Sequence, residues 1–214
     1  MSKPMYVKFE KNAAVARVTL NRPELHNAFD DTMIEQLTHV ARVLATDPSV
    51  RVVILRSEGK SFCAGADLNW MQRMVNYTEE ENLKDAEALA VMFEAWDTLP
   101  QPVIGRIHGA ALGGGVGLVA VCDIAVAASS AVFAFSEVRL GIVPAVISPF
   151  VLQKIGLSAA RELFLTGSRF TAARAKDINL VHHVADAGAL DEEVDSIRRS
   201  LLAGGPEAQN RMKR

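Results

Sequence analysis

Cysteine is almost absent from this sequence, because the 214 residues include only Cys63 and Cys122. Both stand among apolar or small residues, and neither shows the spacing to other ligands that metal sites use. Two isolated cysteines are typical of a reducing compartment rather than of a small, disulfide-stapled secreted domain. The sequence therefore predicts no metal site and disfavours a disulfide.

An excess of positive charge and a membrane-length apolar run are also missing. The net charge is −2, so no basic block is available to bind the phosphates of a nucleic acid. The longest apolar stretch, residues 116–128, is interrupted by Cys122 and Asp123 and is too short to span a bilayer. Residues 1–12 lack the apolar core of a signal peptide. We therefore expect a soluble, cytoplasmic protein with neither a nucleic-acid nor a membrane partner.

Strand-like and helix-like segments alternate along the chain. Residues 14–20 are rich in β-branched side chains and end at a turn-forming Asn-Arg-Pro. Apolar residues then recur at helical spacing from Met33 to Leu44, with Thr32 and Glu35 as a candidate capping box. Further strands are predicted at 52–55, 102–107 and 123–128, and further helices at 79–99, 158–165 and 172–180. Without a linker or low-complexity segment, the pattern indicates one α/β domain.

The end of the chain differs from the rest in pattern. Residues 191–202 have a helical pattern, and residues 204–214 resemble the start of another helix that ends before it can bury a face. We therefore divide the chain into a core of residues 1–190 and a C-terminal helical segment of residues 191–214, which we expect to be incomplete.

The most distinctive segment is glycine-rich, because residues 108–117 read HGAALGGGVG. A helix that begins there would present unpaired backbone N–H groups to an anion. The lysine of a P-loop and the Gly-x-Gly-x-x-Gly of a dinucleotide fold are both missing. A second loop, FCAGAD at 62–67, also follows a strand and offers another N–H group. Close packing of a helix on a sheet is the alternative explanation of the glycines.

Four ordered segments together resemble one known family. Residues 61–68 (SFCAGADL), 108–115 (HGAALGGG), 122–127 (CDIAVA) and 135–144 (FSEVRLGIVP) are similar to signatures of the enoyl-CoA hydratase/isomerase (crotonase) superfamily. The resemblance runs from about Val15 to the chain end, and it implies an α/β fold, a crotonase-like spiral of ββα units with helices around it. It also implies acyl-CoA thioester substrates, a homotrimer or homohexamer, and no cofactor beyond the coenzyme A of the substrate.

The same resemblance assigns roles to individual residues. The backbone N–H groups of Ala66 and Gly114 are expected to form an oxyanion hole for the thioester oxygen, and Glu137 is expected to be the catalytic acid–base. Loss of one such donor costs about 2.7–4 kcal/mol in other enzymes. Typical hydratases of the family carry a second glutamate at the position of Gly117, whereas isomerases often keep only the one that matches Glu137. The residues expected to contact substrate are Ala64, Asp67, Leu68, Trp70 and Gly117.

The resemblance implies an enoyl-CoA hydratase that adds water to an α,β-unsaturated acyl-CoA thioester. The runs GGGVGL (113–118), SEVRLG (136–141) and PAVISP (144–149) resemble a bacterial branch that acts on branched, carboxylated substrates. Those substrates are 3-methylglutaconyl-CoA in leucine breakdown and isohexenylglutaconyl-CoA in acyclic terpene breakdown. Two alternatives stay open. One is a Δ3-Δ2-enoyl-CoA isomerase that uses Glu137 alone, and the other is a catalytically silent acyl-CoA-binding subunit.

Several side chains have two interpretations. For Asp67, hydrogen bonds that fix its own turn are favoured over contact with the substrate. Trp70 either walls the acyl pocket or is ordinary core. Arg139 either meets a substrate carboxylate or forms a surface ion pair. His182 and His183 have Asp186 nearby, but nothing else there indicates a catalytic triad or a metal site.

Overall fold

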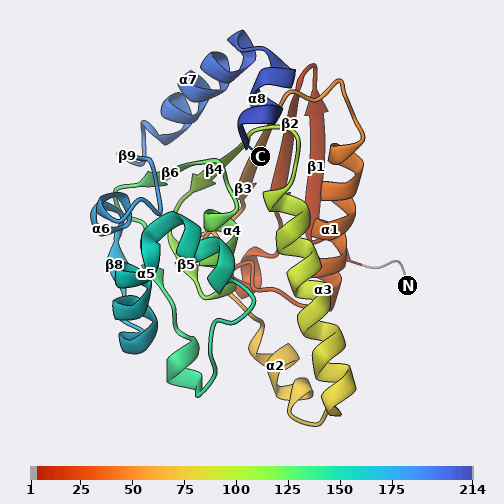
Figure 1. The fold of residues 1–214 in the computed structure, drawn as a ribbon, viewed down its shortest axis with the longest axis vertical. Coiled ribbons are helices and arrows are strands. Elements are labelled where there is room, and N and C mark those ends of the chain that lie inside the picture. The colour runs from red at the N-terminus through yellow and green to blue at the C-terminus, as the bar shows by residue number, and fades with distance from the viewer. Residues whose placement is uncertain (1–3, 214) are drawn as a thin grey trace.

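The computed structural model describes residues 4–213, and strands alternate with helices through most of that range (Figure 1). A six-stranded sheet has the order β1-β2-β3-β4-β6-β9, in which β1 is antiparallel to β2 and the other neighbours are parallel. Apolar residues run almost continuously through its inner strands, as expected of a parallel sheet buried on both faces. Its strands are β1 (Val7–Asn12), β2 (Val15–Leu20), β3 (Val52–Ser57), β4 (Val103–Ile107), β6 (Ile124–Ala128) and β9 (His183–Ala185).

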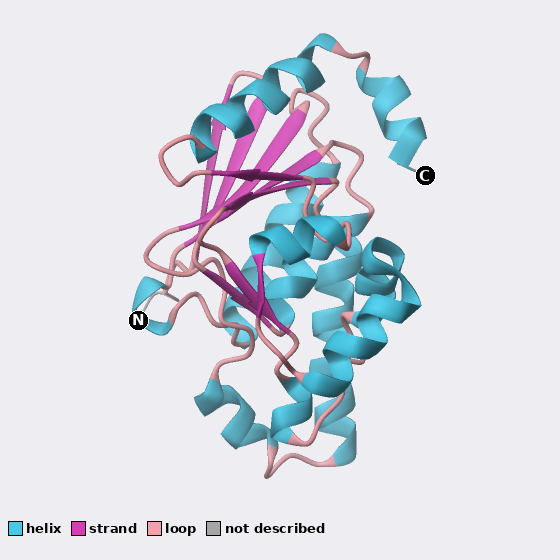
Figure 2. Cartoon of the chain, turned by 90° about the vertical axis from the view of Figure 1, so that its left-hand side faces the viewer, coloured by secondary structure: helices cyan, strands magenta, loops and turns pink. Residues whose placement is uncertain are grey.

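A smaller sheet lies next to the large one (Figure 2). In it β5 (Ala110–Leu112) pairs in parallel with β7 (Val132–Ala134), and β7 pairs antiparallel with β8 (Phe170–Thr171). Each strand has three residues or fewer, so the period-two alternation that identifies a strand in a sequence has no length in which to appear. For this reason β5, β7, β8 and the equally short β9 were not predicted.

Helices cover both faces of the large sheet. Helices α1 and α3 pack against each other on one side (Figure 1), and α7 covers the outer face, where Leu190 and Val194 join a cluster with Ile104 and Val126. The helices are η1 (Pro23–Leu25), α1 (Asp31–Ala45), α2 (Leu68–Met74), α3 (Glu79–Asp97), α4 (Gly114–Ala120), η2 (Glu137–Leu140), α5 (Ser148–Thr166), α6 (Ala172–Asp177), α7 (Leu190–Ala203) and α8 (Pro206–Lys213).

The predicted capping box at Thr32 is wrong, because α1 begins before that residue. Asp30 is the N-cap, and its Oδ1 accepts a hydrogen bond of 2.8 Å from the N–H of Met33. A carboxylate there also interacts favourably with the helix dipole. A reciprocal capping box is instead present at the start of α3, between Thr78 and Glu81.

The helix predicted at residues 158–165 is the second half of a longer helix, α5, which begins at Ser148. Pro149 lies in the first turn, where a missing N–H leaves no intrahelical bond unmade. Gly156, with a φ of 70°, interrupts the helix midway, and Gly167 ends it in the left-handed conformation.

The C-terminal segment predicted from residue 191 contains two helices, α7 and α8, up to residue 213. Cys63 and Cys122 are free and buried. Within residues 4–213, no helix combines the length and the apolar character that crossing a membrane requires.

Candidate active site

Residues 63–67 form a loop held from both sides by backbone hydrogen bonds. On one side, Cys63 donates to the carbonyl of Ala110 and accepts from Leu112, which ties the loop to β5. On the other side, Phe29 N–H donates to the Gly65 carbonyl at 2.7 Å, and Asp67 N–H donates to the Phe29 carbonyl at 2.8 Å. The loop between β3 and α2 is therefore fixed at the edge where β5 begins.

The glycine turn before α4 lies directly against this loop. A Cβ added to Gly65 would stand 2.8 Å from the carbonyl oxygen of Leu112 and 3.6 Å from the nitrogen of Gly114. Gly65 has a φ of 88° and Gly113 has a φ of 50°, a backbone region in which other side chains are strained. Glycine at both positions allows the two backbones to approach each other.

The N–H groups of Ala66 and Gly114 are both available at this contact. Gly114 is the first residue of α4, so its N–H has no partner within the helix. Neither N–H donates to another residue among those the structure describes. Ala66 and Gly114, whose N–H groups the family resemblance assigns to an oxyanion hole, thus lie at one site and line the same cleft.

Glu137 reaches the same place from η2. Its Oε1 lies 3.1 Å from the point that a Cβ on Gly113 would occupy, so the carboxyl group covers the glycine turn. Its Oε2 is buried and has no hydrogen-bond partner among the described residues. Burial raises the pKa of Glu137, because the apolar surroundings disfavour the ionised form. A raised pKa makes the ionised carboxyl group a stronger base than an ordinary glutamate, which suits it to proton transfer.

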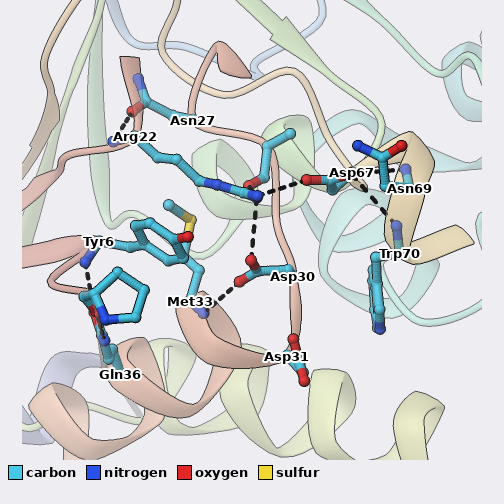
Figure 3. Close-up of polar contacts among 12 residues, drawn as sticks. Tyr6, Arg22, Asn27, Asp30, Asp31, Met33, Gln36, Asp67, Asn69 and Trp70 are labelled. Atoms are coloured by element: carbon cyan, nitrogen blue, oxygen red, sulfur yellow. Dashed lines mark hydrogen bonds and ion pairs between the residues drawn. The ribbon is translucent and has the colours of Figure 1, made fainter. Parts of the chain in front are cut away.

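A buried arginine holds the loop that carries Ala66 (Figure 3). The guanidinium of Arg22 lies 2.7 Å from Asp67 Oδ2 and 3.3 Å from Asp30 Oδ2, and it donates to the Ala28 carbonyl. It also stacks over the ring of Tyr6, 4.7 Å from the centroid. Arg22 therefore links the end of β2, the start of α1 and the residue that follows Ala66.

Asp67 has the role in its own turn that the sequence favours. Its Oδ1 accepts from the N–H groups of Asn69 and Trp70 and so caps α2. Burial alone would raise the pKa of Asp67, but these two N–H groups and the Arg22 guanidinium lower it overall. Asp67 is thus a permanent anion that orders the loop and is unsuited to proton transfer at neutral pH.

These elements surround a cleft of about 760 Å³. A cleft of that size is in the range of small-molecule sites. Ala64, Ala66, Asp67, Leu68, Trp70, Gly114 and Glu137 all line it. Gly117 does not, because it is buried one turn further along α4 and packs against Phe93 and Ile147.

Arg139 lines the cleft as well, on η2. Its Nε donates to the Gly167 carbonyl at 3.1 Å, and it makes no ion pair with any residue in 4–213. The surface ion pair considered for it is therefore not formed. His182 accepts from the Ala125 N–H and His183 contacts Glu193, and the described residues contain no cluster of potential ligands that could hold a metal ion.

Sequence reasoning missed two parts of this site. In the sequence, Arg22 is recognisable only as part of the turn that follows β2. Its role was missed because its carboxylate partners, Asp30 and Asp67, lie elsewhere in the chain. The part of the cleft lining formed by residues 142–147 was also missed. An apolar run looks the same in a sequence whether it lines a cleft or belongs to the core.

Replacing Arg22 by Met should lower the free energy of unfolding by about 3–5 kcal/mol, because Asp67 and Asp30 would be left buried without their cation. Urea unfolding measures this loss. The control is Arg174→Met, which removes an exposed ion pair with Glu162 and should cost less than about 1 kcal/mol. Equal losses in the two variants would contradict the role given to Arg22.

The chain is similar to proteins of a known family. The family described as Enoyl-CoA hydratase/isomerase matches residues 10–214. A mitochondrial enoyl-CoA hydratase from Pongo abelii is 36% identical over 188 residues, which cover 86% of this chain and 62% of that protein. The chain therefore spans less than two-thirds of this relative's length.

Solved structures of related proteins have the same fold as this chain. An enoyl-CoA hydratase from Shewanella pealeana superposes with a TM-score of 0.95 at 38% identity, covering 99% of this chain and 79% of that one. Pseudomonas aeruginosa AtuE superposes with a TM-score of 0.94 at 37% identity, covering 97% and 81%. The predicted α/β fold of crotonase type is thus confirmed, and the chain belongs to the enoyl-CoA hydratase/isomerase family.

Proposed function

We propose that this chain is an enoyl-CoA hydratase in which Glu137 alone carries protons at the reacting carbons. The observation that carries the proposal is the Glu137 carboxyl group over Gly113, beside the free N–H of Gly114, with one oxygen buried and unpartnered. Relatives that are about 35% identical to this chain are named enoyl-CoA hydratases, and this likeness supports the proposed reaction class. Beyond the coenzyme A of the substrate, the reaction uses no cofactor.

The substrate binds with its thioester oxygen between the N–H groups of Ala66 and Gly114. Glu137, as a carboxylate, takes a proton from water while the hydroxide oxygen bonds to Cβ. The electrons of the C=C bond move toward the thioester, and the two N–H groups stabilise the resulting enolate oxygen. Glu137 then gives its proton to Cα, the C=O bond forms again, and the carboxylate is restored.

We further propose that the acyl group carries a carboxylate, of the 3-methylglutaconyl-CoA type. Arg139 supports this, because it is a cation on the cleft wall without an ion-pair partner in residues 4–213. One N–H of its guanidinium is held by Gly167, which leaves the others free to bind an anion. A homotrimer or homohexamer, which the family resemblance implies, and a cytoplasmic location, which the cysteine usage favours, are part of the same proposal.

A second candidate is Δ3-Δ2-enoyl-CoA isomerisation. The observation that favours it is the packing at Gly117, where no second carboxylate is present to share the handling of water. In that reaction Glu137 removes a proton from C2 of a 3-enoyl-CoA and returns it to C4, and the same two N–H groups stabilise the enolate.

Substituting Glu137 by Gln should reduce kcat by about 10²-fold or more while substrate binding persists, because an amide cannot carry the proton. The measurement is the loss of conjugated absorbance of 3-methylglutaconyl-CoA. In the wild type, kcat/KM should fall on acidification through a pKa above the ordinary 4.5 of glutamate, since the carboxylate must be ionised to take a proton from water.

The control for this substitution is Glu207→Gln, which changes an exposed carboxylate on α8. Glu137→Gln should also melt no lower than the wild type at neutral pH. Its raised pKa means that the fold favours the neutral form, so the amide removes an unfavourable charge. Full turnover by Glu137→Gln would refute the mechanism. Gain of conjugation from a 3-enoyl-CoA without hydration would establish the isomerase, and thioester binding with no turnover would establish the silent subunit.

Substituting Arg139 by Met should raise KM for 3-methylglutaconyl-CoA about tenfold or more, because a charge-assisted hydrogen bond is lost. KM for a 2-enoyl-CoA without the second carboxylate is the internal control and should stay within about twofold. An equal rise for both substrates would place Arg139 on the coenzyme A portion and contradict the proposed substrate class.

A further inference from the structure

The position at which family hydratases carry a second glutamate is filled by apolar side chains from other elements. Gly117 is buried in α4, one turn after Gly114. A Cβ at residue 117 would lie 2.5 Å from Cγ2 of Ile147 and 2.8 Å from Cζ of Phe93. Both distances are shorter than two carbon atoms tolerate, so even an alanine at residue 117 would have to displace both side chains.

Phe93 is held in place by its own neighbours. It is fully buried on α3, and its ring meets Phe29 edge-on with a centroid distance of 6.3 Å and Phe150 with a centroid distance of 5.9 Å. Phe29 in turn packs on Gly114, where an added Cβ would lie 2.7 Å from its Cε2. The rings of Phe29, Phe93 and Phe150 and the side chain of Ile147 form an apolar wall along the face of α4 that carries Gly114 and Gly117, and the ring contacts hold Phe93 in its position.

The wall also borders the reaction site. Phe29 and Ile147 line the cleft, while Phe93 stands behind them and closes the space beside Gly117. A carboxylate placed at residue 117 would meet Phe93 and Ile147, and neither side chain offers a donor to stabilise its charge. A water molecule beside these two side chains would gain no hydrogen bond from them.

We propose that Phe93 and Ile147 are specificity-determining residues that exclude a second carboxylate, and the water it would order, from the reacting carbons. The inference rests on the proposed function and deepens it. Water and both proton transfers are then confined to the Glu137 side, and hydration proceeds with a single ionising carboxylate.

The packing is tested by a double-mutant cycle on melting temperature. Gly117→Ala should lower the Tm by about 5 °C, because its methyl group meets Phe93 and Ile147. In the Phe93→Ala background, the same change should cost measurably less, since the ring is gone and the contact with Ile147 is the one that remains. The matched control is Gly115→Ala, whose methyl group would meet Cys63 instead, so its cost should be the same in both backgrounds. If the decreases in Tm caused by Phe93→Ala and Gly117→Ala simply add, Phe93 does not occupy the side-chain space of residue 117, and the proposal is overturned.

The chemistry is tested by the acid limb of the pH profile of kcat/KM with a 2-enoyl-CoA. The wild type should lose activity with the slope of one proton, and Phe93→Ala with Gly117→Glu should acquire a second ionisation. Gly117→Glu alone should lose most of its folded yield. A two-proton slope in the wild type would overturn the exclusion of a second carboxylate. Absence of any wild-type turnover would refute the proposed function instead, while the melting cycle would still decide whether the wall exists.

Discussion

The buried guanidinium of Arg22 is the contact on which the geometry of this site depends. It lies between Asp67 and Asp30, and through them it connects the end of β2, the N-terminus of α1 and the loop that carries Ala66. A buried cation with two carboxylates is stable only when all of its partners are in place. The network therefore admits one arrangement of the loop, and the N–H of Ala66 is fixed in that arrangement before any substrate binds.

Two kinds of carboxylate stand in the same cleft, and their surroundings separate their roles. Asp67 accepts hydrogen bonds and faces a cation, so its pKa is lowered and it remains a structural anion. Glu137 has a buried, unpartnered oxygen and a raised pKa, so it is the group able to exchange a proton. The fold leaves Oε2 of Glu137 buried without a hydrogen-bond partner among the described residues, which is unfavourable for stability and suited to proton transfer.

Much of this arrangement was predictable from local patterns. The inner strands, the long helices and the two glycine-containing loops have strong signals within a few residues, and the family resemblance placed Ala66, Gly114 and Glu137. Contacts between distant residues were not predictable in this way. Nothing near Gly117 in the sequence indicates that Phe93 fills its side-chain space, and Asp30 and Thr32 are both good helix caps, so only the structure decides between them.

An oxyanion hole formed by the Ala66 and Gly114 N–H groups would polarise the thioester carbonyl of the substrate. The direct measurement is the ¹³C NMR shift of a 2-enoyl-CoA labelled at its thioester carbon and bound to the slow Glu137→Gln variant. Two donors on the oxygen draw electron density from the carbon, so we expect a downfield shift relative to the free thioester. A bound resonance at the free position, with binding shown to be saturated, would contradict it.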